Sequence, residues 1–246
     1  MLELKNISYE VSDENDNKEI LKNISLSIDE RFVAITGPNG GGKSTLAKLI
    51  AGIIKPTTGK IFLDGKDITD MSITERAQNG ISFAFQQPVR FKGITVKDLI
   101  TYAVGHPIST TEACSYLSEV GLCAKDYINR ELNASLSGGE AKRIEIAMTM
   151  ARGTALSIFD EPEAGIDLWS FQSLIKVFEM MHEKAGGSII IISHQERILN
   201  IADKIIVLAN GELVNMGGKD EILPSLLTDG PGCSVLMDKM KEVRNG

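Results

Sequence analysis

Residues 37–45 read Gly37-Pro38-Asn39-Gly40-Gly41-Gly42-Lys43-Ser44-Thr45, and this stretch decides the fold. It matches the pattern G-x-x-x-x-G-K-S/T, the phosphate-binding loop or P-loop. An apolar segment, residues 32–36, precedes it, and the segment 46–50 that follows is compatible with a helix. The sequence therefore predicts a strand, a glycine-rich loop and a helix in the order that this motif requires.

The residue types in this stretch suit a triphosphate. Glycine N–H groups can turn inward around phosphate oxygens, because no Cβ blocks a close approach. The N-terminus of the following helix adds a partial positive charge. Lys43 would supply a full charge to the β- and γ-phosphates, and the Ser44 hydroxyl is a candidate Mg²⁺ ligand. We expect residues 37–45 together to bind a nucleoside triphosphate.

Composition limits the class of protein. The chain has 246 residues, 43% of them hydrophobic, and a net charge of −7, which allows a large core and argues against a nucleic-acid partner. The longest apolar run, residues 188–193, has the length of a strand, so we expect no membrane span and a cytoplasmic protein. The cysteines are predicted to be thiols, because their spacing fits neither a disulfide framework nor a metal site: Cys114, Cys123 and Cys233.

The pattern along the chain predicts strands that alternate with helices, and hence a mostly parallel sheet covered on both faces. Two N-terminal strands, 2–10 and 20–28, are expected to be joined by an acidic loop, 13–17. A hairpin turn is expected at Asn210-Gly211. Residues 89–133 have helical spacing and are interpreted as a helical insert, with 1–88 and 134–246 forming the core of one domain. Further strands are expected at 32–36, 61–65, 81–85, 155–159, 188–192 and 204–208, and helices at 141–150 and 169–184.

Two carboxylates follow the apolar strand 155–159. Asp160 and Glu161 would lie at the carboxyl end of a parallel strand, where ligands bind in such sheets. Asp160 is then placed to hold Mg²⁺ through water, and Glu161 is the natural general base for an attacking water. The alternative is an acidic loop with no chemical role.

A second anion site is predicted at Leu136-Ser137-Gly138-Gly139-Glu140. A serine hydroxyl and two glycine N–H groups stand here at the start of a helix. From the residues alone, an N-capped helix with a flexible approach fits equally well.

Six motifs in a fixed order resemble the nucleotide-binding domain of the ABC ATPase superfamily. The resemblance covers nearly the whole chain and implies an α/β P-loop NTPase fold: an ABC-type ATPase core with an antiparallel β subdomain and a small helical subdomain. It also implies hydrolysis of ATP with Mg²⁺. The motifs are the P-loop (37–45), the Q-loop glutamine Gln86, the signature segment Leu136–Glu140, the carboxylates Asp160 and Glu161, the D-loop Ala164-Gly165-Ile166-Asp167, and the switch histidine His194.

The resemblance further implies a role for each motif. Gln86 would approach the attacking water and Mg²⁺, with Ser44 and Asp160 as further metal ligands, and would couple the helical insert to the site. Glu161 would act as the catalytic base, and His194 would contact the γ-phosphate. Two chains would then associate head to tail on binding ATP, and this closure would move a partner attached at the Q-loop and the helical insert. The residues acting in trans, on ATP held by the second chain, would be Ser137, Gly138, Gly139, Glu140 and Asp167.

Two kinds of partner fit this picture. Residues 83–89 (FAFQQPV) with 93–95, and the segments 137–143 and 193–199, resemble SufC, the ATPase of iron–sulfur cluster assembly. Val11 stands where many transporter ATPases have an adenine-stacking aromatic, which also suits SufC and puts strict base selectivity in question. This predicts a SufB/SufD-type scaffold as partner. The alternative is the ATP-binding subunit of a transporter, docked on a membrane permease subunit. A module that binds ATP without turnover is disfavoured by Glu161 and His194.

Overall fold

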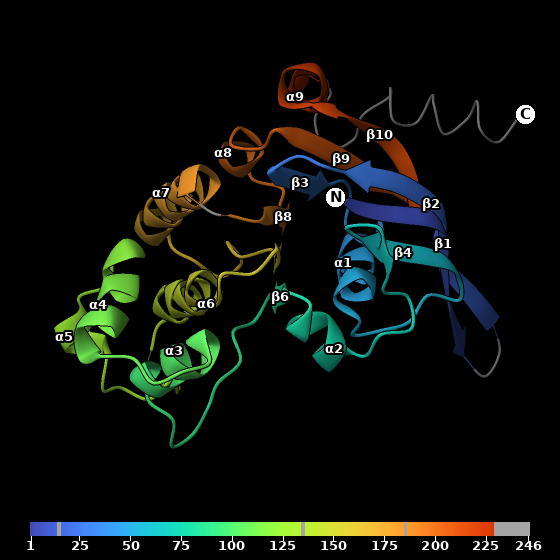
Figure 1. Ribbon diagram of the computed structural model, residues 1–246. Coiled ribbons are helices and arrows are strands. Elements are labelled where there is room, and N and C mark those ends of the chain that lie inside the picture. Colours follow the sequence, from blue (N-terminus) through green and yellow to red (C-terminus); the bar gives the residue numbers. More distant parts are fainter. Residues whose placement is uncertain (14–15, 134–135, 185, 229–246) are drawn as a thin grey trace, which may run out of the picture. The chain divides into compact units, whose positions relative to one another are not determined.

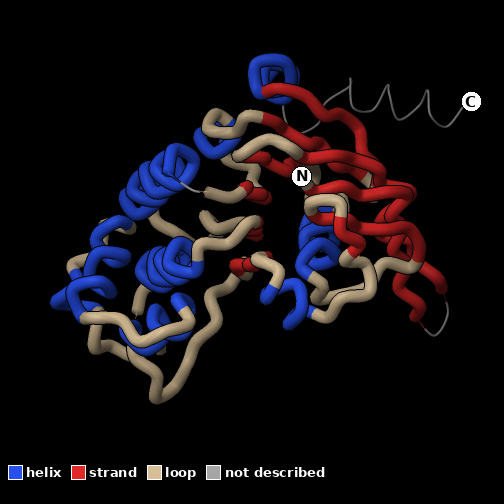
Figure 2. The backbone as a smooth tube through the Cα atoms, viewed as in Figure 1, coloured by secondary structure: helices blue, strands red, loops and turns tan. Residues whose placement is uncertain are grey.

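The computed structural model describes residues 1–13, 16–133, 136–184 and 186–228. It divides into two compact units, one formed by Met1–Arg76 with Ile192–Gly246 and the other by Ala77–Ile191. Figure 1 shows the elements along the chain, and Figure 2 shows that strands dominate the first unit and helices the second.

The first unit contains most of the strands. Its helix α2 ends two residues beyond the boundary between the units. Its strands are β1 (Leu2–Asp13), β2 (Asp16–Ile28), β3 (Phe32–Thr36), β4 (Thr58–Leu63), β5 (Lys66–Asp67), β9 (Lys204–Ala209) and β10 (Glu212–Gly218). Its helices are α1 (Lys43–Ala51), α2 (Ile73–Gln78), α8 (Glu196–Leu199) and α9 (Lys219–Thr228).

The second unit is mainly helical. Its helices are α3 (Val96–Val104), α4 (Thr110–Glu119), α5 (Ala124–Tyr127), α6 (Gly138–Arg152) and α7 (Leu168–Lys184). Its strands are β6 (Ile81–Ala84), β7 (Leu156–Asp160) and β8 (Ser188–Ile192), the last of which ends at the boundary between the units.

An antiparallel sheet in the order β2-β1-β4-β5 confirms the predicted β subdomain. Leu4 of β1 pairs with Leu26 of β2 on one side and with Ile61 of β4 on the other, and all three side chains are buried. The β1–β2 hairpin is longer than predicted. Asp13 pairs with Asp16 inside the expected loop 13–17, because strands that are already aligned extend their ladder until a turn interrupts it.

Strand β3 leads into the P-loop. It is buried at all five positions, as expected for a parallel strand covered on both faces, and Thr36 at its end pairs with Val207 of β9. Strand β9 continues into the antiparallel β10 through Asn210 and Gly211. Their φ angles of 52° and 81° are both positive, which is typical of a type I′ turn. The predicted hairpin is confirmed.

In the second unit, β6 and β7 pair in parallel, with Ile81 opposite Leu156 and Ala84 opposite Phe159. Strand β8 lies on the other side of β7, and β7 is buried throughout. Helix α6 contacts α3, α4, α7 and β6; it begins three residues before the predicted helix 141–150, because Ser137 caps it. The predicted alternation of parallel strands and helices is confirmed.

The carboxyl end of α1 is held by a buried arginine. Arg76 is 0% exposed, and its guanidinium donates to the carbonyl oxygens of Leu49 (2.5 Å), Ile50 (2.8 Å) and Thr69 (2.9 Å). Gly52 leaves room for it, since a Cβ there would lie 2.8 Å from Arg76 Cδ. Burial lowers the pKa of Arg76. The carbonyl oxygens at the negative end of α1 compensate the buried charge.

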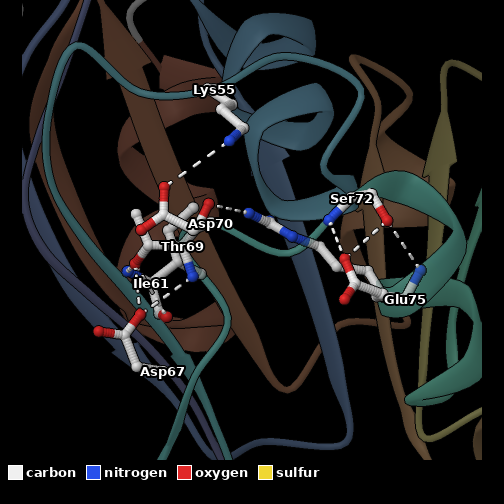
Figure 3. A network of polar contacts seen from close by, with 8 residues as sticks. Lys55, Ile61, Asp67, Thr69, Asp70, Ser72 and Glu75 are labelled. Carbon is white, nitrogen blue, oxygen red and sulfur yellow. Dashed lines mark hydrogen bonds and ion pairs between the residues drawn. The ribbon is translucent and has the colours of Figure 1, made fainter.

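Short polar contacts hold the chain segment that precedes Arg76, and Figure 3 labels the residues that form them. The Asp67 carboxylate accepts hydrogen bonds from the Thr69 hydroxyl (2.6 Å) and the Thr69 N–H (3.0 Å). The N–H of Ile61 in β4 donates to Thr69 Oγ1 at 2.9 Å. Ser72 and Glu75 cap α2 reciprocally, because each accepts a hydrogen bond from the backbone N–H of the other. These contacts fix the segment that carries Arg76.

Among the described residues, no helix combines the length and the apolar character needed to cross a bilayer. Cys114 and Cys123 are thiols rather than disulfide partners, as predicted. Cys233 lies outside the described residues.

Candidate functional site

The P-loop backbone closes against the start of the β9–β10 turn. Gly37 has φ 132°, and a Cβ at this position would lie 1.9 Å from the carbonyl oxygen of Leu208. Gly41 accepts a hydrogen bond from the N–H of Gly211 at 3.2 Å. Only glycine fits at Gly37, for reasons of space as well as dihedral angle. The loop is therefore shaped by the strand beside it.

Helix α1 begins directly at the P-loop lysine. Its N-cap is Gly42, so no side chain caps the helix, an arrangement in which the first N–H groups of a helix bind anions. Lys43 is 5% exposed, and its Nζ donates to the carbonyl oxygens of Gly37 (2.8 Å) and Pro38 (2.9 Å). Its ammonium group thus lies over the loop that is predicted to hold phosphate.

His194 follows β8 and is exposed. The preceding residue, Ser193, is fully buried, and its N–H donates to the carbonyl oxygen of Ile35 in β3 at 3.2 Å. The Ser193 hydroxyl accepts from the N–H of Gln195 at 3.0 Å. Two hydrogen bonds on Ser193 therefore fix the backbone just before His194, the predicted switch histidine. One of them attaches this backbone to β3, the strand that precedes the P-loop.

In the second unit, the structure brings the predicted Q-loop glutamine and base together. Gln86 Nε2 donates to Glu161 Oε2 at 2.7 Å. Glu161 follows the last residue of β7, the buried Asp160, and has φ 45°. A left-handed conformation is costly for a residue with a side chain and recurs at active sites as well as in turns. The main chain thus turns Glu161 away from the strand direction at this point.

A buried ion pair that sequence reasoning missed lies beneath the Q-loop. The ammonium of Lys142 in α6 donates to the carbonyl oxygen of Phe85 and lies 3.5 Å from Glu145 Oε2. The N–H of Phe85 donates to Glu145 Oε1 at 3.2 Å. Burial lowers the pKa of Lys142 and raises the pKa of Glu145. Two opposite charges three residues apart on α6 were the available sequence signal.

The signature segment is an N-terminal cap with a fixed geometry. Ser137 Oγ accepts from the N–H of Glu140 at 3.2 Å, and Glu140 Oε2 accepts from the N–H of Ser137 at 2.7 Å. This is a capping box at the start of α6. The capping box confirms that Ser137 caps the helix. It is also compatible with an anion site, since Ser137 is exposed and its hydroxyl hydrogen can still be donated.

The two segments predicted to act in trans lie together. A Cβ at Gly138 would be 3.3 Å from the carbonyl oxygen of Gly165, and one at Gly139 would be 3.1 Å from Ser170. Asp167 Oδ1 accepts from the N–H groups of Trp169 and Ser170, both at 3.0 Å, and so caps α7. These hydrogen bonds lower the pKa of Asp167. The signature glycines and the D-loop therefore form one surface of the second unit.

No group of three or more His, Cys, Asp or Glu side chains that could hold a metal occurs within residues 1–13, 16–133, 136–184 and 186–228. The predicted Mg²⁺ donors are of another kind: the Ser44 hydroxyl, the Gln86 amide and the Asp160 carboxylate. All three offer oxygen, which Mg²⁺ prefers, and Mg²⁺ is usually bound by few protein ligands together with substrate phosphates. The donor set fits that ion.

The chain is similar in sequence to a known family and to individual proteins. The sequence model of the ABC transporter family matches residues 21–164. An uncharacterized ABC transporter ATP-binding protein of Methanocaldococcus jannaschii is 40% identical over 215 residues, which cover 84% of this chain and 86% of that protein. Vegetative protein 296 of Bacillus subtilis is 35% identical over 233 residues, which cover 89% and 87%.

Solved structures show the same fold. A dimeric ATP-binding cassette in a post-hydrolysis state with ADP and phosphate matches with a TM-score of 0.80 and 26% identity, over 89% of this chain and 99% of that one. The protein cbiO1 of Clostridium perfringens, part of the ABC transporter complex cbiONQ, matches with a TM-score of 0.75 and 27% identity, over 91% and 90%.

The chain belongs to the ABC transporter ATP-binding family. It is an ABC ATPase, which binds and hydrolyses ATP, and the predicted α/β fold with an antiparallel β subdomain is confirmed. The two relatives described above carry names other than SufC.

Proposed function

We propose that this ATPase is the nucleotide-driven subunit of a larger ABC system, with Glu161 as its catalytic base. The observation that carries this assignment is the 2.7 Å hydrogen bond from Gln86 to Glu161. An amide that donates to one oxygen of a carboxylate fixes the orientation of that carboxylate, and a carboxylate held in place can act as a general base towards a bound water. The left-handed backbone of Glu161 supports the same role.

The proposed reaction is the hydrolysis of ATP, and it needs only ATP and water as reactants. The oxygen of water forms a bond to the γ-phosphorus of ATP, and the bond from that phosphorus to the β,γ-bridging oxygen breaks. Glu161 accepts a proton from the water, and ADP and phosphate leave. The residues 37–45 bind the phosphates, with Lys43 opposing their charge, and His194 contacts the γ-phosphate. Mg²⁺, held by Ser44, Gln86 and Asp160, would neutralise charge that develops on the phosphate oxygens.

Two copies of the chain are proposed to close on ATP. Each would contribute Ser137–Glu140 and Asp167 to the ATP held by the other. The capped, exposed Ser137 and the closeness of Gly138 to Gly165 of the D-loop support this. So does the dimeric state of one structurally similar cassette, which was solved twice as a dimer. ATP can drive such a change only by binding the closed state more tightly than the open one. Hydrolysis then resets the pair.

The partner is proposed to be a membrane permease subunit, at the cytoplasmic face of a membrane. The matching family is described as ABC transporter, and one structurally similar protein is part of a transporter complex. Relatives that include a spermidine/putrescine import ATP-binding protein of Mesoplasma florum, 31% identical over 90% of this chain, support the same class.

A SufC-like role is the second candidate. Residues 83–89 and 193–199 resemble the SufC segments, and Val11, 43% exposed, supplies no aromatic ring for stacking on adenine. In this case the partner would be a SufB/SufD-type scaffold in iron–sulfur cluster assembly. Affinity purification from the native host separates the candidates, because a polytopic membrane protein would co-purify in one case and a soluble scaffold in the other.

The catalytic proposal is tested with Glu161→Gln. This variant should form a dimer on adding ATP and Mg²⁺, measured by light scattering after gel filtration, and should lose turnover by about 10²–10⁴-fold, the usual contribution of a general base. Lys43→Ala in the same background is the control, since it should bind ATP weakly and remain monomeric. Turnover at the wild-type rate by Glu161→Gln would show that Glu161 is not the base.

A further inference from the structure

A tyrosine outside the known motifs touches the signature glutamate. The hydroxyl of Tyr127, the last residue of α5, donates to Glu140 Oε1 at 2.5 Å. The other oxygen of the same carboxylate, Oε2, accepts from the N–H of Ser137 at 2.7 Å. Both oxygens of Glu140 are therefore engaged, one in the capping box and one by Tyr127. Glu140 cannot rotate without breaking one of these bonds.

Backbone hydrogen bonds and a contact with Arg130 hold the segment that carries Tyr127. The N–H of Arg130 donates to the carbonyl oxygen of Tyr127 at 2.9 Å, and the N–H of Lys97 at the start of α3 donates to that of Ile128 at 3.0 Å. The Arg130 guanidinium lies 5.3 Å from the centre of the Tyr127 ring, a cation–π distance. Tyr127 thus approaches Glu140 from a rigid segment, so its hydroxyl can hold the carboxylate in one orientation.

The charges of the pair suit this geometry at neutral pH. The hydrogen bond from Tyr127 is the main cause that lowers the pKa of Glu140, and the same bond raises the pKa of Tyr127. The tyrosine therefore stays protonated as a donor and the glutamate stays ionised as an acceptor. A hydrogen bond to an ionised acceptor is stronger than one between neutral groups.

We propose that Tyr127 is a positioning residue for the signature segment. It locks Glu140, and through the capping box it sets the orientation in which Ser137 and the two glycines meet the γ-phosphate of ATP bound to a second copy. This inference rests on the proposed function in trans. A tyrosine that only stabilised the helical insert would not affect dimerisation apart from its effect on folding.

The test is Tyr127→Phe, which removes one oxygen and keeps the ring. In the Glu161→Gln background, we expect the dissociation constant of the ATP-bound dimer to rise at least about tenfold, the usual effect of losing one hydrogen bond to a charged group. Sedimentation velocity over a range of protein concentrations at saturating ATP measures it. Binding of ATP to the monomer, measured at protein concentrations below dimerisation, should be unchanged because residues 37–45 are untouched.

A second pair of variants shows whether Tyr127 acts through Glu140. In a Glu140→Ala background, Tyr127→Phe should have no further effect on dimerisation, since coupled residues are not additive. Tyr116→Phe in α4 is the matched control and should leave dimerisation as it was. With Glu161 intact, Tyr127→Phe should lower kcat at low protein concentration while KM for ATP changes less than twofold.

The outcomes separate this inference from the proposed function. If Glu161→Gln does not dimerise with ATP, the proposed function fails and the inference fails with it. If Glu161→Gln dimerises and Tyr127→Phe leaves its dissociation constant unchanged, only the inference is overturned. In the Glu161→Gln background, equal losses from Tyr127→Phe with Glu140 intact and with Glu140→Ala would also overturn it, because Tyr127 would then act independently of Glu140.

Discussion

The side-chain amide of Gln86 donates a 2.7 Å hydrogen bond to the carboxylate of Glu161, and this bond joins the chain just beyond β6 to the residue that follows β7. The two strands pair in parallel, so they bring their carboxyl ends to the same edge. One end leads into the Q-loop and the other carries the proposed base. A partner that displaces the Q-loop would therefore move the Glu161 carboxylate or break this hydrogen bond.

Gln86→Ala removes the group that orients this carboxylate. We expect kcat to fall roughly 100-fold, within the range for losing one positioned catalytic group, with KM for ATP nearly unchanged because residues 37–45 are intact. Steady-state ATPase assays measure both constants. Gln87→Ala changes the exposed neighbour and should keep wild-type kinetics. If both variants lost activity equally, the bond from Gln86 to Glu161 would not matter for turnover.

Gly37→Ala places a methyl group 1.9 Å from the Leu208 carbonyl oxygen at φ 132°. The P-loop must shift, so ATP binding measured by calorimetry should be lost, and the free energy of unfolding should fall by more than about 1 kcal/mol. Gly65→Ala is the matched control. Gly65 has φ 78° but nothing within 4 Å of its Cβ position, so it should show only the dihedral cost and bind ATP normally.

Arg76→Met removes the three hydrogen bonds that a fully buried guanidinium donates to the carbonyl oxygens of Leu49, Ile50 and Thr69. We expect the free energy of unfolding to fall by about 3 kcal/mol, measured by urea denaturation. Arg76→Lys should recover only part of the lost free energy, because one ammonium group cannot reproduce the hydrogen bonds of a planar guanidinium. The exposed Arg152 donates a single bond to the Ala77 carbonyl oxygen, and Arg152→Met should cost less than about 1 kcal/mol.

The pKa of Asp67 should lie below the ordinary value of an aspartate. Hydrogen bonds from the Thr69 hydroxyl, the Thr69 N–H and Lys60 lower its pKa from 3.8 to about 2. Since the folded pKa lies below the unfolded one, the stabilisation from Asp67 is present above about pH 4 and is lost as the pH falls towards 2. A carboxyl NMR titration measures the midpoint. Thr69→Val should move it towards 3.8, and a wild-type midpoint already near 3.8 would contradict the hydrogen bonds shown in Figure 3.

Much of the fold was predictable because its motifs are local. Glycines before Lys43, a serine followed three residues later by Glu140, and Asn210-Gly211 between apolar runs each report on a few adjacent residues. Strand β8 was predicted at its observed bounds, since four consecutive isoleucines shortly after two glycines have few alternatives.

Contacts between distant segments could not be predicted in the same way. Arg76 shows no pattern in sequence that marks it as buried, because its burial is decided by α1, which lies more than 20 residues earlier. Tyr127 and Glu140 are 13 residues apart on separate helices, and no periodicity connects them. Helix α2 was missed because it is only six residues long, too short for helical periodicity to stand out.

Trp169 is the chain's only tryptophan and is 79% exposed at the second position of α7, two residues after Asp167. All tryptophan fluorescence of the protein therefore comes from one known position, beside the D-loop. The protein carries an intrinsic optical probe at that point. Whether water leaves the start of α7 during a nucleotide cycle can be followed in real time with unlabelled protein.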